Sequence, residues 1–205
     1  MYMNPMFMQY CAQPFDDEQY LFEPLIDGQR LQLTMFGDKV GLYTRNHNDV
    51  TRQYPELHNV PLKSPSDIVL DGEVACVNPN TRQFDYNLLQ QRFRLKRLPM
   101  IREAKLIIPV AYYVFDILYY NGSDLRNTPL YQRKQLLNEI IEDNAYYRKM
   151  IYWEEAGNEM FQFSKRFELE GVACKRRDSA YREGRCDDSW LKVLNSEYKR
   201  LKQAE

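Results

Sequence analysis

The sequence predicts a single mixed α+β domain in which largely antiparallel sheets are flanked by helices. Apolar and polar residues alternate through much of the first half, a pattern typical of half-buried strands. In the second half, apolar residues recur at helical spacing between shorter strand-like runs. No internal repeat, low-complexity tract or linker divides the 205 residues. This length suits one domain with a core of ordinary size.

The strands of the first half are read from alternation and turn residues. "RLQLTMF" (30–36) and "VGLYTR" (40–45) lie on either side of a Gly-Asp turn and predict a β-hairpin. "DIVLDGEVACV" (67–77) predicts a third strand. "KLIIPVAYYVFDILYY" (105–120) is rich in Val, Ile and Tyr and ends at an Asn-Gly turn, so it predicts a long buried strand.

Three helices are predicted between and after these strands. They cover "FDYNLLQQRF" (84–93), "LYQRKQLLNEIIED" (130–143) and "EEAGNEMFQFSKRFELE" (154–170). Thr128 and Pro129 suit the cap and the first position of the second helix. In the third, Met160, Phe163 and Phe167 share one face and are expected in the core.

The end of the chain is expected to return to the sheet. Residues 171–177 and 189–194 predict two closing strands, and 196–205 predicts a polar helical tail. The four cysteines form no C-x-x-C pair, which argues against a zinc knuckle or a disulfide framework and predicts buried reduced thiols.

Composition restricts the class of protein and of partner. Hydrophobic residues make up 44% and charged residues 28%, as in globular proteins, and no apolar run approaches the roughly 20 residues that cross a bilayer. With no secretory leader at the N-terminus, we expect a cytoplasmic protein without a membrane partner. The net charge of −1 gives no overall attraction for nucleic acid, but residues 92–105 and 164–185 are locally basic and would permit a phosphate-bearing partner.

Six charged or aromatic motifs occur in a fixed order along the chain. They are "EPLIDGQR" (23–30), "YTRNHNDVTRQYPEL" (43–57), "DGEV" (71–74), "YYVFDIL" (112–118), "EGVACK" (170–175) and "SWLKVL" (189–194). From about Phe15 to Leu194, the series resembles the nucleotidyltransferase domain of ATP-dependent DNA ligases. The wider family includes RNA ligases and messenger-RNA capping enzymes.

The first motif of that family contains a lysine that attacks the α-phosphorus of ATP and forms a lysyl-adenylate. Asp27, Gly28 and Arg30 match the motif, but Leu25 stands where the lysine belongs. A leucine side chain has no nitrogen lone pair, so it cannot act as this nucleophile. The last motif shows a second departure, because it keeps Lys192 but has Leu194 at the place of a second lysine.

The resemblance also implies a role for each remaining motif residue. It places Glu23 near adenine, Phe115 stacked on the base, Glu73 near the ribose hydroxyls, Arg30 and Arg45 near phosphates or the nick, and Lys175 and Lys192 against phosphate charge. Glu170 is implied as a ligand of Mg²⁺ or Mn²⁺. ATP or AMP is therefore the expected nucleotide, bound without covalent attachment.

The sequence thus predicts an ATP-dependent DNA ligase-like adenylation domain over residues 1–205, monomeric and without a C-terminal oligonucleotide-binding barrel. By resemblance its substrate is nicked double-stranded DNA, as in replication, repair and recombination. Leu25 predicts that it cannot adenylate itself. The alternative is a non-catalytic nucleotide- or nick-binding module, and a weaker one is an RNA ligase or capping-type nucleotidyltransferase.

Overall fold

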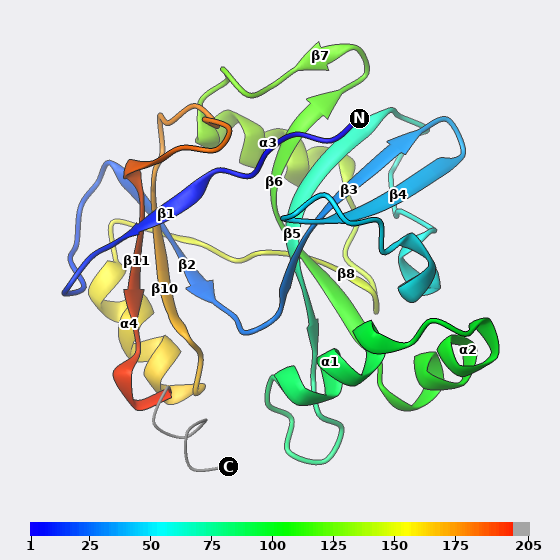
Figure 1. Ribbon diagram of the computed structural model, residues 1–205. Helices are drawn as coiled ribbons and strands as arrows, with labels where there is room; N and C mark the ends of the chain where they lie inside the picture. Colours follow the sequence, from blue (N-terminus) through cyan, green and yellow to red (C-terminus); the bar gives the residue numbers. More distant parts are fainter. Residues whose placement is uncertain (199–205) are drawn as a thin grey trace.

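Two β-sheets face each other in the computed structural model, which describes residues 1–198 (Figure 1). The first sheet has the order β1-β11-β10-β2-β9, and the second has the order β4-β3-β5-β6-β7 with β8 paired to β6. Most pairs are antiparallel, while β1–β11 and β6–β8 are parallel. The first sheet comprises β1 Phe7–Tyr10, β2 Tyr20–Leu25, β9 Trp153–Glu154, β10 Gly171–Arg176 and β11 Cys186–Leu194. The second comprises β3 Gln29–Phe36, β4 Lys39–Thr44, β5 Ile68–Cys76, β6 Val110–Tyr120, β7 Ser123–Asp124 and β8 Tyr147–Lys149.

Helices cover the outer faces of both sheets. Met160 of α4 (Gly157–Arg166) packs on the outer face of the first sheet, against Phe22 and Val172. The outer face of the second sheet is covered by residues of α1 (Tyr86–Arg94) and α3 (Leu130–Ile140) and by a segment with two 3₁₀ turns, η1 (Thr51–Gln53) and η2 (Pro55–Leu57). A third cluster lies between the sheets, so the α+β prediction is confirmed.

The predicted hairpin and first helix are present close to their expected bounds. β3 and β4 pair in register from Leu31–Thr44 to Phe36–Lys39. α1 begins after Asp85, whose side chain accepts a hydrogen bond from the backbone N–H of Leu88 at 2.9 Å. An acidic cap of this kind satisfies one of the free N–H groups at a helix start.

The long strand predicted over 105–120 begins later than expected. Residues Leu98–Ile107 form a further helix, α2, which the sequence analysis missed, and β6 starts only at Val110. Pro109 follows the last residues of α2, and a proline shortly after a helix end prevents its continuation. The boundary was hidden because Leu106, Ile107 and Ile108 read equally well as strand or helix.

The predicted Thr128 cap of α3 is wrong. Pro129 occupies the cap position and no side chain caps the helix. Instead, the carbonyl oxygens of Ser179 and Arg177 accept hydrogen bonds from Leu130 N and Tyr131 N, at 3.0 and 2.9 Å. The helix is therefore capped by the backbone that follows β10, which only the tertiary fold brings near.

The third predicted helix is shorter than expected, and one of its core residues is exposed. Met160 is fully buried and Phe163 partly so, but Phe167 is 52% exposed. Phe167 is the C-cap of α4, just before Glu168 at a positive φ of 52°, so it lies where the helix turns away from the sheet.

The N-terminal segment is ordered, although no strand was predicted there. Met3 and Met6 are buried between the sheets, and β1 pairs with β11. Cys76 and Cys174 are buried as expected, whereas Cys11 is only half-buried and Cys186 is exposed, so the prediction of burial is wrong for Cys186 and holds only in part for Cys11. The predicted C-terminal helix is present over 196–198, and its remainder lies outside the described residues. No helix among residues 1–198 is long and apolar enough to cross a membrane.

Candidate nucleotide-binding site

The inner face of the first sheet carries the motif residues in three rows across β2, β10 and β11. Strand register places Leu25, Gly171 and Leu194 in one row, Glu23, Ala173 and Lys192 in the next, and Leu21, Lys175 and Trp190 in the third. Directly paired residues point to the same side of a sheet, and so do residues two apart along a strand. The nine side-chain positions therefore form one surface, which faces the second sheet.

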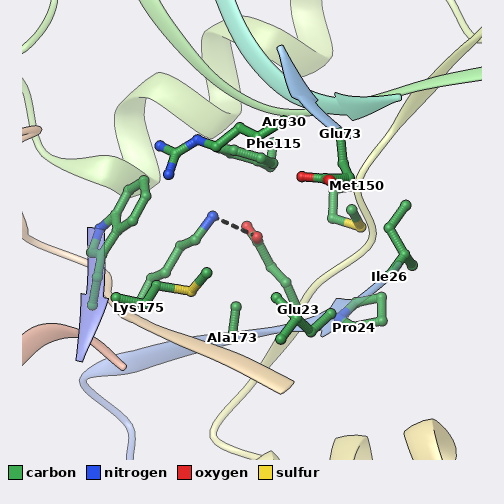
Figure 2. Close-up of a pocket in the computed structure, with 12 residues that line it drawn as sticks. Glu23, Pro24, Ile26, Arg30, Glu73, Phe115, Met150, Ala173 and Lys175 are labelled. Carbon is green, nitrogen blue, oxygen red and sulfur yellow. Dashed lines mark hydrogen bonds and ion pairs between the residues drawn. The ribbon is translucent and has the colours of Figure 1, made fainter. Parts of the chain in front are cut away.

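One end of this surface is buried and carries charge. Lys175 Nζ lies 2.6 Å from Glu23 Oε2 (Figure 2). Lys134 of α3 forms an ion pair with the other carboxylate oxygen. All three side chains are about 2–3% exposed. Burial lowers the pKa of Lys175, while the Glu23 carboxylate opposes that shift.

Aromatic rings enclose the same lysine. The Nζ of Lys175 lies 4.1 Å from the ring centroid of Phe115 and 4.3 Å from the Trp190 ring. These residues line a cavity of about 50 Å³ together with Glu23, Ala173 and Arg30. The cavity presents a carboxylate oxygen and an ammonium group side by side, next to a flat aromatic surface.

The other end opens into a polar groove of about 580 Å³. The groove gathers residues from five of the six motifs, among them Leu25, Arg45, Glu73, Glu170 and Lys192. Leu25 and Leu194 lie in one row on either side of Gly171, about 10 Å apart across two strand spacings. A Cβ at Gly171 would lie 2.0 Å from the Val193 carbonyl oxygen, so no side chain fits between them.

The carboxyl group of Glu73 is perturbed in this groove. Burial raises its pKa to about 8, Arg30 opposes this change, and the nearby Glu170 adds to it. Two carboxylates thus share a groove that also contains the cations Arg45 and Lys192.

Comparisons with known proteins agree with this geometry. The family model for the ATP dependent DNA ligase domain matches residues 5–193. The chain belongs to this family. The SPbeta prophage-derived DNA ligase-like protein LigB of Bacillus subtilis is 33% identical over 198 residues, which cover 97% of this chain and 69% of that protein. The DNA ligase of Thermococcus fumicolans is 30% identical over 202 residues, 93% of this chain and 36% of its own length.

Two solved structures are similar over most of the chain. The ligase domain from M. tuberculosis LigD has a TM-score of 0.75 at 28% identity, covering 94% of this chain and 59% of that one. A mycobacterial DNA ligase D complexed with ATP and MES has a TM-score of 0.76 at 27% identity, covering 94% and 60%. The fold is therefore that of ATP-dependent ligase domains, and this chain spans about three fifths of those two structures.

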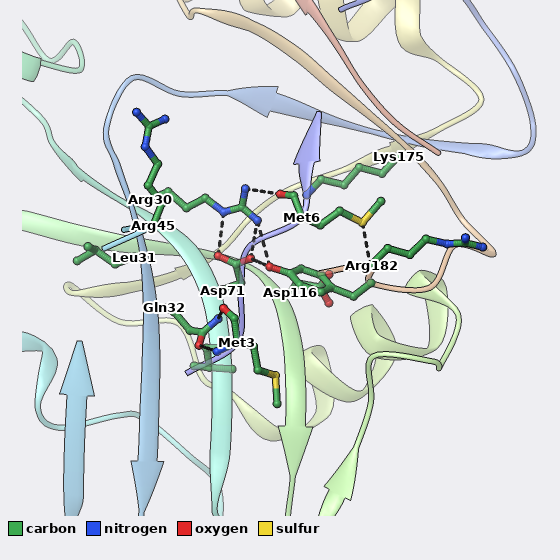
Figure 3. Close-up of polar contacts among 12 residues, drawn as sticks. Met3, Met6, Arg30, Leu31, Gln32, Arg45, Asp71, Asp116, Lys175 and Arg182 are labelled. Carbon is green, nitrogen blue, oxygen red and sulfur yellow. Dashed lines mark hydrogen bonds and ion pairs between the residues drawn. The ribbon is translucent and has the colours of Figure 1, made fainter. Parts of the chain in front are cut away.

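Two motif residues of this ligase domain make contacts within the protein. Arg30 donates to both carboxylate oxygens of Asp71, at 3.1 and 2.7 Å, and to the Met6 carbonyl oxygen at 2.7 Å (Figure 3). Tyr181 donates to Asp71 at 2.6 Å. Asp27 accepts a hydrogen bond from the Tyr198 hydroxyl at 2.8 Å. Arg30 also lines both the cavity and the groove, so it joins the two ends of the site.

Sequence reasoning missed several residues of the ligase site. Lys134 lies within the helix predicted over 130–143, and nothing in its spacing indicates that it pairs with Glu23. Trp190 lies in the last motif, but the sequence indicated no role for it. In the structure it is 1% exposed and its ring packs against Lys175. Asp71 was placed in a predicted strand without a role, but from β5 it binds Arg30. A charged residue in the middle of a strand of apolar residues is the signal that could have identified Asp71.

The side chains of the groove could hold a divalent cation only together with a bound nucleotide, whose phosphates would supply further ligands. Residues 1–198 contain no group of three or more His, Cys, Asp or Glu that could hold a metal. Glu73 and Glu170 nevertheless line one groove, and Mg²⁺ commonly takes one or two carboxylates together with substrate phosphates and water. The groove therefore fits a cation that arrives with phosphate.

Proposed function

We propose that this ligase domain binds adenine nucleotides reversibly and seals nicks in DNA that already carry a 5′-adenylate, without forming a lysyl-adenylate of its own. The observation that carries the proposal is that Leu25 lines the groove and shares a row with Leu194 across Gly171. Neither leucine has a nitrogen that could attack the α-phosphorus of ATP.

The buried cavity supports adenine as the base. The Glu23 carboxylate can accept a hydrogen bond from the exocyclic amino group, and the Lys175 ammonium can donate to the adjacent ring nitrogen N1. Guanine has an oxygen and an N–H at the corresponding places, which would meet a carboxylate and an ammonium with the wrong polarity. Phe115 adds a flat face for stacking, and opening the cavity around the base is part of binding.

In this proposal Lys175 reads the base, because it lies at the Glu23 end of the site rather than in the groove. This differs from the phosphate contact that the sequence resemblance implies for it. The groove residues Lys192 and Arg45 are then the cations available for phosphates, with Glu73 toward the ribose hydroxyls. The mycobacterial ligase solved with ATP supports a nucleotide in this fold.

The sealing step does not need the missing lysine. The 3′-hydroxyl oxygen of the nick attacks the adenylated 5′-phosphorus, and a new phosphodiester P–O bond forms. The P–O bond to AMP breaks, AMP leaves with that bonding electron pair, and the hydroxyl proton passes to solvent. Lys192 and Arg45 would stabilise the added negative charge on the phosphate oxygens. A divalent cation held by Glu170 would supply further charge neutralisation when bound.

The test compares two nicked duplexes on a denaturing gel at low salt, one with a pre-adenylated 5′-phosphate and one with an ordinary 5′-phosphate plus ATP. We expect slow sealing of the first and none of the second, with Mg²⁺ or Mn²⁺ present. Lys192→Met should abolish sealing, while Lys63→Met, an exposed lysine outside the groove, should not change it.

A non-catalytic nucleotide-binding module is the second candidate, and the same two leucines favour it. If the pre-adenylated nick stays unsealed at every metal concentration while ATP still binds, the sealing proposal fails and this module takes its place. Absence of nucleotide binding would contradict both.

A further inference from the structure

Five basic side chains form an exposed arm next to the groove. We name as the basic arm Arg94, Lys96, Arg97, Arg102 and Lys105, which lie on the end of α1, the following loop and α2. All are exposed except Lys105, which is half-buried beside the Tyr146 ring. Within residues 1–198 none of the five forms an ion pair at 4.0 Å or less.

The arm is locally strongly positive on a chain that is almost neutral. Residues 94–105 contain these five cations against one carboxylate, Glu103, for a local net charge of +4, whereas the whole chain carries −1. The other basic stretch, 164–185, does not form such a patch. Its Lys175 is buried, and Lys165 pairs with Glu197.

A buried arginine fixes the arm to the domain. Arg92 is fully buried and donates to the Ile101 carbonyl oxygen of α2 at 2.9 Å and to Glu56 at 2.6 Å. It also donates to the Gln53 carbonyl oxygen at 3.1 Å. Arg92 is buried and therefore unavailable to a ligand. It connects α1 and α2 to the segment with the two 3₁₀ turns.

The arm continues the groove wall. Tyr86, Gln90 and Phe93 of α1 line the groove that contains Lys192 and Arg45. Arg94 follows Gln90 by four residues, so it lies on the same side of α1, and α2 follows directly (Figure 1). Cations therefore extend from the groove along α1 and onto α2.

We infer that the basic arm binds the backbone phosphates of the DNA duplex that flanks the nick. This inference rests on the proposed function, because it takes the groove as the place where the nick lies. Unpaired cations along a surface attract phosphate and release counterions from DNA when they bind it. Leu106 and Ile107 of α2 are 82% and 64% exposed and would suit a protein partner, but the charge of the neighbouring residues favours DNA.

The test measures binding of a nicked duplex by fluorescence anisotropy over a series of salt concentrations. The variant Arg94→Ala/Lys96→Ala/Arg97→Ala is compared with the control Lys63→Ala/Lys165→Ala/Arg166→Ala, which removes the same charge from residues that do not line the groove. The plot of log K against log salt has a negative slope, and each lost phosphate contact makes it less steep by about 0.9. The slope of the arm variant should therefore be less steep by up to about 2.7, and this variant should bind DNA at least about tenfold more weakly at low salt. The control should stay within about twofold of the parent.

The outcomes separate this inference from the proposed function. If the arm variant keeps the slope and affinity of the parent while the parent binds ATP and seals the pre-adenylated nick, the arm does not bind DNA. Its exposed apolar residues would then favour a protein partner. If the arm variant loses the slope while the parent neither binds ATP nor seals, the inference stands and the proposed function fails. Circular dichroism spectra and unfolding midpoints should be the same in all three proteins, which confirms that the variants are folded.

Discussion

The two ends of the site differ in how their charged side chains are paired. At the base end, both oxygens of Glu23 pair with buried lysines, and Lys175 is enclosed by two aromatic rings. At the end proposed for phosphates (the phosphate end), Leu25 lines the groove and shares a row with Leu194, and Lys192 lies on the next row. In the proposed function, one end recognises the base and the other lacks the nucleophilic amine. Binding and covalent nucleotidyl transfer would then be separable in this ligase domain.

The largest expected effect comes from breaking the base end. Glu23→Gln would leave Lys134 and Lys175 buried without their counter-charge, which should lower the free energy of unfolding by about 3–5 kcal/mol. Denaturant unfolding followed by circular dichroism measures the loss. The matched control is Glu154→Gln on the neighbouring strand β9, whose side chain is 51% exposed, and we expect a change within about 0.5 kcal/mol. Equal midpoints for the two variants would mean that the ion pairs do not hold this end together.

Removing the aromatic face should weaken nucleotide binding next. Phe115→Ala is expected to cost about 1–3 kcal/mol of ATP affinity if the ring stacks on adenine, measured by titration calorimetry. Phe167→Ala, which removes an exposed ring on α4, should leave the affinity unchanged. A folded Phe115→Ala protein that binds ATP as tightly as the parent would rule out stacking.

The phosphate end can be probed through the pH dependence of stability. The pKa of Glu73 is raised to about 8 in the folded protein, from an ordinary value of 4.5. Between these values the folded state binds more protons than the unfolded state, so the free energy of unfolding falls as the pH rises through this window. The Glu73→Gln variant lacks this titration. Between the two pKa values, its free energy of unfolding should fall by about 1–2 kcal/mol less than that of the parent. Parallel pH profiles for parent and variant would contradict the raised pKa.

The smallest effect concerns one hydrogen bond to the base. An ATP analogue with carbon in place of N1 should bind the parent about 5- to 10-fold more weakly than ATP, because Lys175 loses its acceptor. In Lys175→Met the two nucleotides should bind alike. An analogue with carbon in place of N7 is the control and should lose nothing relative to ATP in either protein. Equal binding of ATP and the N1 analogue to the parent would remove Lys175 from base recognition.

Much of the fold follows from local sequence patterns, as the β3–β4 hairpin and the Asp85-capped helix show. The missed features depend on distant parts of the chain. α3 is capped by carbonyl groups from the segment after β10, and the N-terminal segment is ordered because Met3 and Met6 fill space between the sheets. Local propensity cannot predict such contacts, because the residues that make them are far apart in the sequence.

The same contrast holds for the site. The order of six motifs pointed to residues that the structure gathers in one groove, including Arg45, Glu73, Glu170 and Lys192. The sequence did not show that Lys175 lies at the Glu23 end or that Lys134 joins it, because those positions depend on strand register and on the docking of α3. Placing Leu25 and Leu194 in one row required the register of three strands.

The central claim is that nucleotide binding survives here without covalent transfer. The direct test is intact-protein mass spectrometry after incubation with ATP and Mg²⁺, on the parent and on Leu25→Lys/Leu194→Lys. We predict no added mass on the parent and an acid-labile gain of one AMP on the double variant, which restores an amine at position 25 and a cation at position 194 in the same row. A gain of one AMP on the parent, at Lys192 or any other lysine, would contradict the account.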